Sequence, residues 1–275
     1  MLGAIAGDII GSPYEFNRNN IKTVDFPLFS ERSRFTDDSV MTCATAWAFI
    51  ELTDKRGEAI DKNAFAETLI NCMHELGRAY PLVGYGPKFA QWLARRSREP
   101  YGSFGNGSAM RVSPIAWAFD DLDTVEEFAA LSAAVSHNHP EGVKGALATA
   151  SSIFLARSGN TKEQIRDYVS ERYGYDLSRT IAEIRPSYKF DATCPGSAPE
   201  AITAFLEGES YEDTVRKAVS IGGDSDTIAC IAGAIAEAFY NGVPEEIMRE
   251  TLIRLDENLR KIFDAWCDWM MGGSE

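Results

Sequence analysis

Two short acidic clusters are the strongest candidates for chemistry in this 275-residue sequence. The first is Thr36-Asp37-Asp38, and the second is the run from Gly222 to Thr227, which holds Asp224 and Asp226. Each cluster precedes an apolar run with helical periodicity. One interpretation is N-capping, because Thr, Ser and Asp side chains satisfy the free N–H groups of a first helical turn. Capping needs only one side chain per helix, however, so it leaves most of these oxygen atoms without a role.

The crowding of the carboxylates favours a second interpretation, a metal site. Neighbouring carboxylates repel each other unless a cation neutralises them, and the two helices that follow are apolar enough to be buried. Only Arg32, Arg34 and Arg111 are candidates for nearby positive charge. A ligand set made of oxygen atoms alone selects hard cations such as Mg²⁺ or Mn²⁺. We therefore expect two divalent cations, with Asp226 as the ligand that they share.

Other metal sites fit the sequence less well. The acidic clusters lack the long alternating loop of an EF-hand. Zinc would need a tetrahedral set of His and Cys ligands, and His137 and His139 have no Cys or Glu pattern that completes such a set. None of the five cysteines belongs to a C-x-x-C pair. We expect them to be reduced thiols, most of them buried.

A glycine-rich loop and a lone glutamate complete the candidate site. The loop Gly102–Gly107 could direct backbone N–H groups at an anion where a helix resumes, although most such loops are simple turns. It matches neither the P-loop nor the dinucleotide-binding fingerprint, since no G-K-[ST] follows it and no strand precedes it. Glu15 lies between Pro13 and a polar stretch. It can therefore be an ordinary surface residue or a mobile acidic group at the edge of the site.

Helical signals dominate the segments that must position these residues. Gly3, Gly7 and Gly11 recur every four residues, so a helix there would offer one narrow stripe for close approach of another backbone. Three capping-box patterns predict further helix starts: Thr124-x-x-Glu127, Thr161-x-x-Gln164 and Ser197-x-x-Glu200. Periodicity and turn signals predict helices from Thr36 onward and over 63–77, 87–96, 140–157, 224–241, 244–255 and 257–271.

The fold class follows from this pattern. No segment shows a convincing strand alternation, and no linker or internal repeat divides the chain. We therefore expect an all-α protein in which residues 1–275 form a single compact domain of orthogonally packed helices. The active-site cleft should lie at helix N-termini and loops, because one domain is the simplest way to bring the helix starts at 36 and 224 together.

Bulk composition narrows the function classes. The formal net charge is −14. Nucleic acid is therefore an unfavourable partner, because a protein that binds a phosphate backbone usually carries positive charge. No apolar run approaches the roughly 20 residues that span a bilayer, and the N-terminal segment lacks the basic start of a signal peptide. We expect a cytoplasmic, monomeric protein with no membrane association.

Five motifs in a fixed order resemble one known family. They are G-D-x-x-G-x-x-x-E from Gly7, F-T-D-D-S from Phe35, G-N-G-S-A-M-R from Gly105, S-H-N-H-P from Ser136 and G-G-D-S-D-T-I-A from Gly222. This pattern, which extends over residues 2–241, is similar to that of the ADP-ribosylglycohydrolase family. The resemblance implies an all-α fold with two Mg²⁺ ions, or Mn²⁺ in some members, in a cleft.

The same resemblance implies a role for each matching residue. The ligands that it implies for one metal are Thr36, Asp37, Asp38 and Asp226, and those for the other are Asp224, Asp226 and Thr227. Glu15 matches a mobile acidic residue that is a candidate acid or base, and Asp38 is a second catalytic candidate. The residues that match the family's pocket for diphosphate and ribose are Gly102, Ser103, Phe104, Gly105, Asn106 and His137. Ser39 and Ser225 replace threonines of many members, at positions that carry no implied ligand.

The expected function is hydrolysis of the glycosidic bond between ADP-ribose and an acceptor. The acceptor would be an ADP-ribosylated protein side chain such as arginine, or a small molecule, and the metals would hold hydroxyls of the ribose beside that bond. Two alternatives stay open. One is a catalytically silent module that binds ADP-ribose, and the other is a different two-metal hydrolase acting on a nucleotide.

Overall fold

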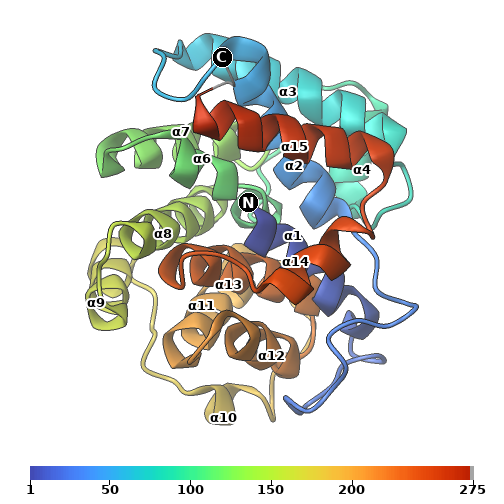
Figure 1. Ribbon diagram of the computed structural model, residues 1–275, viewed down its shortest axis with the longest axis vertical. Coiled ribbons are helices and arrows are strands. Elements are labelled where there is room, and N and C mark those ends of the chain that lie inside the picture. Colours follow the sequence, from blue (N-terminus) through green and yellow to red (C-terminus); the bar gives the residue numbers. More distant parts are fainter. Residues whose placement is uncertain (273–275) are drawn as a thin grey trace.

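Every regular element that the structure describes, in residues 1–272, is a helix (Figure 1). In this computed structural model no β-strand occurs in that range, and Gly105 and Thr193 form an isolated β-bridge. The helices are α1 Leu2–Gly11, the 3-10 helix η1 Ser12–Tyr14, α2 Asp37–Leu52, α3 Lys62–Ala79, α4 Pro87–Ala94, α5 Gly107–Met110, α6 Ser113–Ala118, α7 Leu122–Ala134, α8 Pro140–Arg157, α9 Lys162–Tyr173, α10 Ile181–Ile184, α11 Cys194–Glu207, α12 Tyr211–Ile221, α13 Ser225–Phe239, α14 Glu245–Leu252 and α15 Glu257–Met271. The all-α class expected from the sequence is confirmed.

Helices α1 and α13 form the centre of the molecule, and their backbones lie against each other. All ten residues of α1 are buried. Gly7 faces the backbone of Ala229, and Gly11 faces that of Ser225 and Asp226, with too little space at either glycine for a β-carbon. Gly3 makes an equally close approach one turn earlier. The predicted glycine stripe is therefore confirmed, and its partner is the helix that follows the second acidic cluster.

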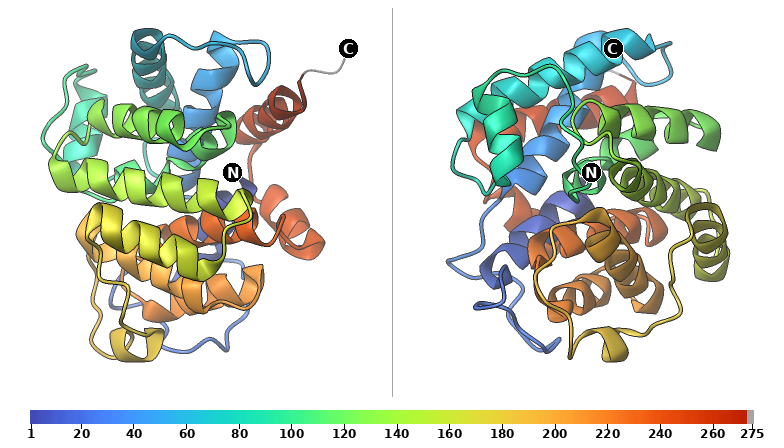
Figure 2. Two further views of the ribbon diagram at one scale, coloured as in Figure 1. Left: turned by 90° about the vertical axis from the view of Figure 1, so that its left-hand side faces the viewer. Right: turned by 180° about the vertical axis from the view of Figure 1, so that it is seen from behind.

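The other helices pack on both sides of this central pair. In Figure 1, α3 and α15 lie toward one end of the long axis and α10 and α12 toward the other, with α1 and α13 between them. Helix α8 contacts α7, α9, α11 and α13, and thus links the two ends of the molecule (Figure 2). The buried side chains form one continuous hydrophobic core.

Helix boundaries show where local patterns suffice. Helices α8 and α15 span the residues expected for them. Helix α3 continues through Gly77 to Ala79, although a stop at Gly77 was expected. Gly77 contacts the side chain of Leu93 in α4 so closely that a β-carbon would clash, so this glycine allows close packing of two helices and does not end one.

Of the three predicted capping boxes, only the one at Thr161 is confirmed: its hydroxyl accepts from Gln164 N, and the Gln164 side chain accepts from Thr161 N. Helix α7 is capped by Asp121, which accepts a 2.8 Å hydrogen bond from Thr124 N. Helix α11 is capped by Thr193 and has a proline in its first turn, which places Ser197 inside the helix. A box that the sequence analysis missed caps the short α10, between Thr180 and Glu183.

The cysteines agree with the expectation of free thiols. All five are unpaired; Cys43, Cys72, Cys194 and Cys230 are buried, and Cys267 is half-buried. None of the helices in residues 1–272 is both long enough and apolar enough to cross a membrane.

Candidate functional site

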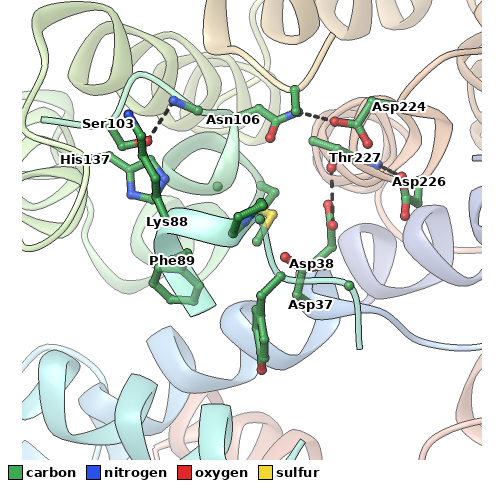
Figure 3. Close-up of a pocket in the computed structure, with 18 of the residues that line it drawn as sticks. Asp37, Asp38, Lys88, Phe89, Ser103, Asn106, His137, Asp224, Asp226 and Thr227 are labelled. Atoms are coloured by element: carbon green, nitrogen blue, oxygen red, sulfur yellow. Dashed lines mark hydrogen bonds between the residues drawn. The ribbon is translucent and has the colours of Figure 1, made fainter. Parts of the chain in front are cut away.

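A cleft of about 700 Å³ collects most of the residues singled out by the sequence. Both acidic clusters contribute to its lining, as do Glu15, the glycine-rich loop and His137. Figure 3 places Asp224, Asp226 and Thr227 on one side of the cleft and His137 and Ser103 on the other. Gly102 and Phe104 lie outside this lining, and the Phe104 ring, 45% exposed, packs beside His139.

The two acidic clusters meet although they are far apart in the chain. The Thr227 hydroxyl donates a 3.2 Å hydrogen bond to Asp38 Oδ2, across a separation of 189 residues (Figure 3). Asp38, Asp224, Asp226 and Thr227 are all at most 5% exposed. The starts of α2 and α13 therefore form one buried acidic centre beside α1.

Capping accounts for only part of this centre. The Thr36 hydroxyl accepts a hydrogen bond from Asp38 N, so it does cap α2. Asp224 occupies the N-cap position of α13, but its side chain makes no capping bond. Its Oδ2 atom instead accepts a 2.6 Å hydrogen bond from Asn106 Nδ2 of the glycine-rich loop. The Asp224 carboxylate therefore does not cap α13, and it contacts the glycine-rich loop instead.

Asp8 is a member of the centre that the sequence analysis missed. It is fully buried on α1. Its carboxylate accepts hydrogen bonds from Thr36 N (2.9 Å), the Thr36 hydroxyl (2.7 Å), Ser39 N (3.1 Å) and the Ser39 hydroxyl. Asp8 thereby fixes the start of α2 from a different helix. The signal available in the sequence was a single charged residue inside an otherwise apolar segment.

Carboxylate oxygens in the centre converge at two places. Oxygen atoms of Asp8, Asp38 and Asp226 lie within 4.8 Å of one another, and so do those of Glu15, Asp224 and Asp226. Asp226 belongs to both groups. Asp38 Oδ1 is buried and has no hydrogen-bond partner in the described chain. Because an unpartnered buried carboxylate oxygen is unfavourable, and the donor set is all oxygen, these residues fit a hard divalent cation.

The electrostatics of the centre agree with that fit. Within residues 1–272, none of its carboxylates forms an ion pair with a basic side chain. Burial and the neighbouring Asp226 hold the pKa values of Asp37 and Asp38 well above the ordinary range. Burial also raises the pKa of Asp224 to about 7. No basic side chain of the described chain therefore forms an ion pair that would offset the repulsion between these crowded carboxylates.

Two of the three arginines considered as neutralising partners, Arg32 and Arg111, have other roles. Arg111 is fully buried, and its guanidinium donates to Gly107 O, Ser132 O and the Ser136 hydroxyl. Arg32 donates to the backbone of the 3-10 helix, at Pro13 O. Neither pairs with a carboxylate of the acidic centre.

Glu15 reaches the cleft from a constrained turn. The next residue, Phe16, has a positive φ of 69°, donates its N–H to Gly223 O (2.8 Å) and stacks on Phe190 with ring centroids 5.1 Å apart. Burial, then Asp226 and Asp8, raise the pKa of the half-buried Glu15 to about 8. Phe16 and Phe190 both line the cleft, and no sequence motif had indicated either of them.

Internal contacts already occupy part of the glycine-rich loop. Gly102 N donates to Asn138 Oδ1 (2.8 Å), Gly105 N donates to the Ser103 hydroxyl (3.1 Å), and Asn106 N donates to Ala192 O (3.0 Å). These three N–H groups hold the loop in shape. Ligand contacts must therefore come from the remaining N–H groups of the loop and from side chains around it.

The comparisons with known proteins cover almost the whole chain. A family model described as ADP-ribosylglycohydrolase matches residues 1–271. The chain is 27% identical to ADP-ribosylhydrolase ARH3 of Mus musculus, over 96% of this chain and 90% of that protein. It is also 27% identical to ADP-ribosylhydrolase ARH3 of Homo sapiens, over 96% of this chain and 92% of that protein. An uncharacterized protein of Archaeoglobus fulgidus is also 27% identical to the chain, over 96% of this chain and 94% of that protein.

A solved structure supports the fold. A chain of an ADP-ribosylglycohydrolase-related protein complex superimposes with a TM-score of 0.65 at 22% identity, covering 98% of this chain and 97% of that one. The family model, the relatives and the arrangement of the five motifs around one cleft agree. The chain belongs to the ADP-ribosylglycohydrolase family.

Proposed function

We propose that this protein is a metal-dependent hydrolase that cleaves the glycosidic bond between ADP-ribose and an acceptor, releasing ADP-ribose. The observation that carries the proposal is the buried acidic centre, whose two oxygen groups share Asp226 and open into the same cleft as the glycine-rich loop. Membership of the ADP-ribosylglycohydrolase family supports the choice of substrate, because the family model and the ARH3 relatives are named for that activity.

Two groups of ligands are proposed for two Mg²⁺ or Mn²⁺ ions. The first group is Thr36, Asp37, Asp38 and Asp226, and the second is Asp224, Asp226 and Thr227. The buried Asp38 Oδ1, which has no hydrogen-bond partner in the described chain, gives the strongest support for a cation ligand in the first group. When bound, such a pair can orient hydroxyls of the ribose and lower the pKa of a water molecule.

Asp8 has a different role in this proposal. Its two oxygen atoms already accept hydrogen bonds from two N–H groups and two hydroxyls. A carboxylate that is so fully used is a poor additional ligand, but it is an effective anchor. Asp8 therefore positions Thr36 and Asp38, as residues behind the ligands commonly do in metal sites.

Glu15 is the proposed acid or base, and Asp38 is the second candidate. In hydrolysis, water supplies a hydroxyl to C1 of the ribose, while the acceptor leaves with the bonding electrons and takes up a proton. In the metal-free protein burial raises the pKa of the Glu15 carboxyl to about 8, and its place beside Asp224 and Asp226 would let this carboxyl exchange a proton with the departing atom or with water. Positive charge that develops on the ribose would face the neighbouring carboxylates, which stabilise it.

The remaining residues would bind the rest of the ligand. Diphosphate and ribose are proposed to lie beside Ser103, Gly105, Asn106 and His137, which all line the cleft. Ser103 and His137 lie across the cleft from Asp224 and Asp226 (Figure 3). Gly102 and Phe104 are proposed as contacts at the outer edge of the same loop. The acceptor that we propose is a protein side chain such as arginine, whose positive charge suits a protein with a formal net charge of −14.

The proposal is tested by a hydrolysis panel. Purified protein is incubated with ADP-ribosyl-arginine and ADP-ribosyl-serine peptides, in Mg²⁺, in Mn²⁺ and in EDTA, and free ADP-ribose is quantified. Release from at least one peptide only when metal is present supports the proposal. Release in EDTA contradicts the metal dependence. Binding of ADP-ribose with no release from either peptide would indicate a silent module, and release of phosphate would indicate a nucleotide hydrolase.

A further inference from the structure

Arg111 is a buried cation with no anionic partner in the described chain. It follows the short helix α5, and its side chain is fully buried. Its Nη1 donates to Gly107 O (3.0 Å), and its Nη2 donates to Ser132 O (2.7 Å) and to the Ser136 hydroxyl (3.0 Å). Burial lowers the pKa of Arg111 to about 10, so it keeps its charge at neutral pH. A positive charge therefore lies directly beneath the glycine-rich loop.

Ser136 connects this cation to His137. The Ser136 oxygen lies 2.8 Å from His137 Nδ1 and is fully buried. Arginine has no acceptor, so Ser136 must accept from Arg111, and its own proton remains for a second bond. His137 Nδ1 is the only other partner of this hydroxyl among residues 1–272. If Nδ1 carried a proton, the buried hydroxyl would have nothing to donate to, which is unfavourable.

The other ring nitrogen of His137 faces the glycine-rich loop. A β-carbon built on Gly107 would lie 3.1 Å from His137 Nε2, and one built on Gly105 would lie 3.5 Å from it. Within the described residues Nε2 has no hydrogen-bond partner of its own. Figure 3 shows the ring beside Ser103, across the cleft from Asp224 and Asp226. The glycines thus leave the space in which an atom of a ligand can approach Nε2.

One titratable group, Tyr101, lies against the ring, and a second, Arg111, is connected to it through Ser136. The Tyr101 ring meets it edge-on at 5.6 Å between centroids, and Arg111 adds a positive charge on the Nδ1 side. Burial, followed by the charge of Arg111, lowers the pKa of His137 well below its ordinary value. A second cation next to Arg111 would be repelled by it, so the imidazole stays uncharged.

We propose that Ser136, oriented by Arg111, is a positioning residue that locks His137 in its neutral Nε2–H tautomer, so that the ring offers a single N–H donor to an oxygen atom of the ligand beside Gly105 and Gly107. The Arg111 guanidinium donates to the Ser136 hydroxyl, and this hydroxyl donates to His137 Nδ1. His137 Nε2–H then remains free to donate to a ligand. In this arrangement His137 binds and orients the substrate, and it transfers no proton.

The identity of the ligand oxygen rests on the proposed function. In ADP-ribose the oxygens suited to this place belong to the diphosphate or to the adjoining ribose. A diphosphate oxygen suits it better, since it accepts from Nε2–H and is also attracted by Arg111, which has no other counter-charge. A charged imidazolium would bind an anion as well, but it would lose that role at higher pH. The neutral donor keeps that role on both sides of the ordinary histidine pKa.

The tautomer is measured directly, without any ligand. The chain has three histidines, so long-range ¹H–¹⁵N spectra of uniformly labelled protein can be assigned with single variants. His137 is expected to show a protonated Nε2 and an unprotonated Nδ1 from about pH 6 to about pH 8, across the ordinary histidine pKa. A protonated Nδ1, or a ring that titrates near the ordinary pKa, would overturn the proposal. This result is independent of hydrolysis, so it fails or succeeds separately from the proposed function.

A pair of matched variants tests the role of Ser136. Ser136→Ala removes the donor to Nδ1 and is expected to give a mixture of tautomers and to weaken ADP-ribose binding about tenfold, with a larger effect on KM than on kcat. Ser132→Ala is the control, because that hydroxyl is also buried but has no hydrogen-bond partner. It should keep the wild-type tautomer and affinity. Ser136→Thr retains a hydroxyl and should restore the Nε2–H signature.

The variants can also contradict the proposal. If Ser136→Ala shows the same tautomer and affinity as Ser132→Ala, the hydroxyl does not position the ring. Thermal unfolding of each variant confirms that it is folded before its spectra are compared. If a Ser136 variant fails to fold, the wild-type spectrum alone still decides which nitrogen carries the proton.

Discussion

The side-chain amide of Asn106 donates a 2.6 Å hydrogen bond to Asp224 Oδ2, and this contact joins the glycine-rich loop to the acidic centre. The same amide donates to the Ser197 hydroxyl at 2.9 Å, and all three residues are buried. A ligand that moves the loop would therefore also act on a carboxylate proposed to bind metal. The glycine-rich loop and the acidic centre are therefore structurally coupled through this contact.

Asn106→Ala should weaken both halves of the site. It removes the hydrogen bond that orients Asp224, and loss of such a supporting contact typically lowers metal affinity by about 10-fold to 100-fold. Calorimetric titration with Mn²⁺ measures this metal affinity. Titration with ADP-ribose measures the affinity of the glycine-rich loop for its proposed ligand. Asn160→Ala is a suitable control, because that amide bonds only to Leu155 O, far from the cleft. Equal Mn²⁺ affinities for the two variants would show that Asn106 does not support the metal site.

Asp226→Ala should abolish metal binding at both positions, whereas Asp38→Ala should mainly remove one. The reason is that Asp226 contributes oxygen to both convergent groups and Asp38 to only one of them. The number of bound Mn²⁺ ions per protein, measured by calorimetry, distinguishes these outcomes. Two intact binding events in Asp226→Ala would sink the assignment of Asp226 as the shared ligand.

The metal-free protein should lose stability as the pH rises. The folded pKa values of Asp224, about 7, and Glu15, about 8, lie above the ordinary values of free carboxyl groups. A raised folded pKa contributes stability that is complete below the unfolded pKa and is lost as the pH rises through the folded one. The free energy of unfolding should fall by about 1.4 kcal/mol per pH unit for each such group, from roughly pH 4 up to about pH 7 for Asp224 and about pH 8 for Glu15.

Urea unfolding in EDTA at a series of pH values measures this slope. Repeating the series in saturating Mg²⁺ or Mn²⁺ should flatten it, because a bound cation replaces the protons on the carboxylates. A metal-free protein that becomes more stable over this pH range would contradict the raised pKa values.

Asp38→Asn and Asp8→Asn should have opposite effects on the metal-free protein. Asp38 Oδ1 is buried without a partner among repelling carboxylates, so neutralising Asp38 should stabilise the fold by about 1–2 kcal/mol while weakening metal binding. The Asp8 carboxylate accepts four hydrogen bonds, so its replacement should destabilise the fold by about 2–4 kcal/mol. Denaturation in EDTA compares the two. A loss of stability in both variants would mean that Asp38 is also structural.

Local sequence patterns predicted the helices of the site better than its contacts. The starts of α2 and α13 were predictable because capping residues precede apolar runs, and the carboxylates were predictable because they crowd there. Asp8 was not, since nothing in an apolar helix reveals that one aspartate will face the start of another helix. Phe16 and Phe190 were missed for the same reason, because their stacking joins segments that are distant in the chain.

The two wrong capping boxes have a related cause. A Ser or Thr three residues before Glu is a local pattern, and several residues nearby can compete to cap the same helix. Asp121 caps α7 in place of the predicted Thr124, three residues earlier in the chain. Thr193 caps α11 in place of the predicted Ser197, four residues earlier. The pattern thus located the helices correctly but placed their first residues too late.

The close contact between α1 and α13 also determines when the protein can first function during its synthesis. Helix α1 leaves the ribosome early, yet each of its residues is buried, and the surface that its glycines require is not translated until α13 is made. Until then the nascent chain lacks the surface that buries α1, and its acidic centre lacks Asp224 and Asp226. A chain that stops before α13 therefore lacks both a finished core and a complete acidic centre. We therefore expect such a chain to be inactive and to be recognised by chaperones and proteases.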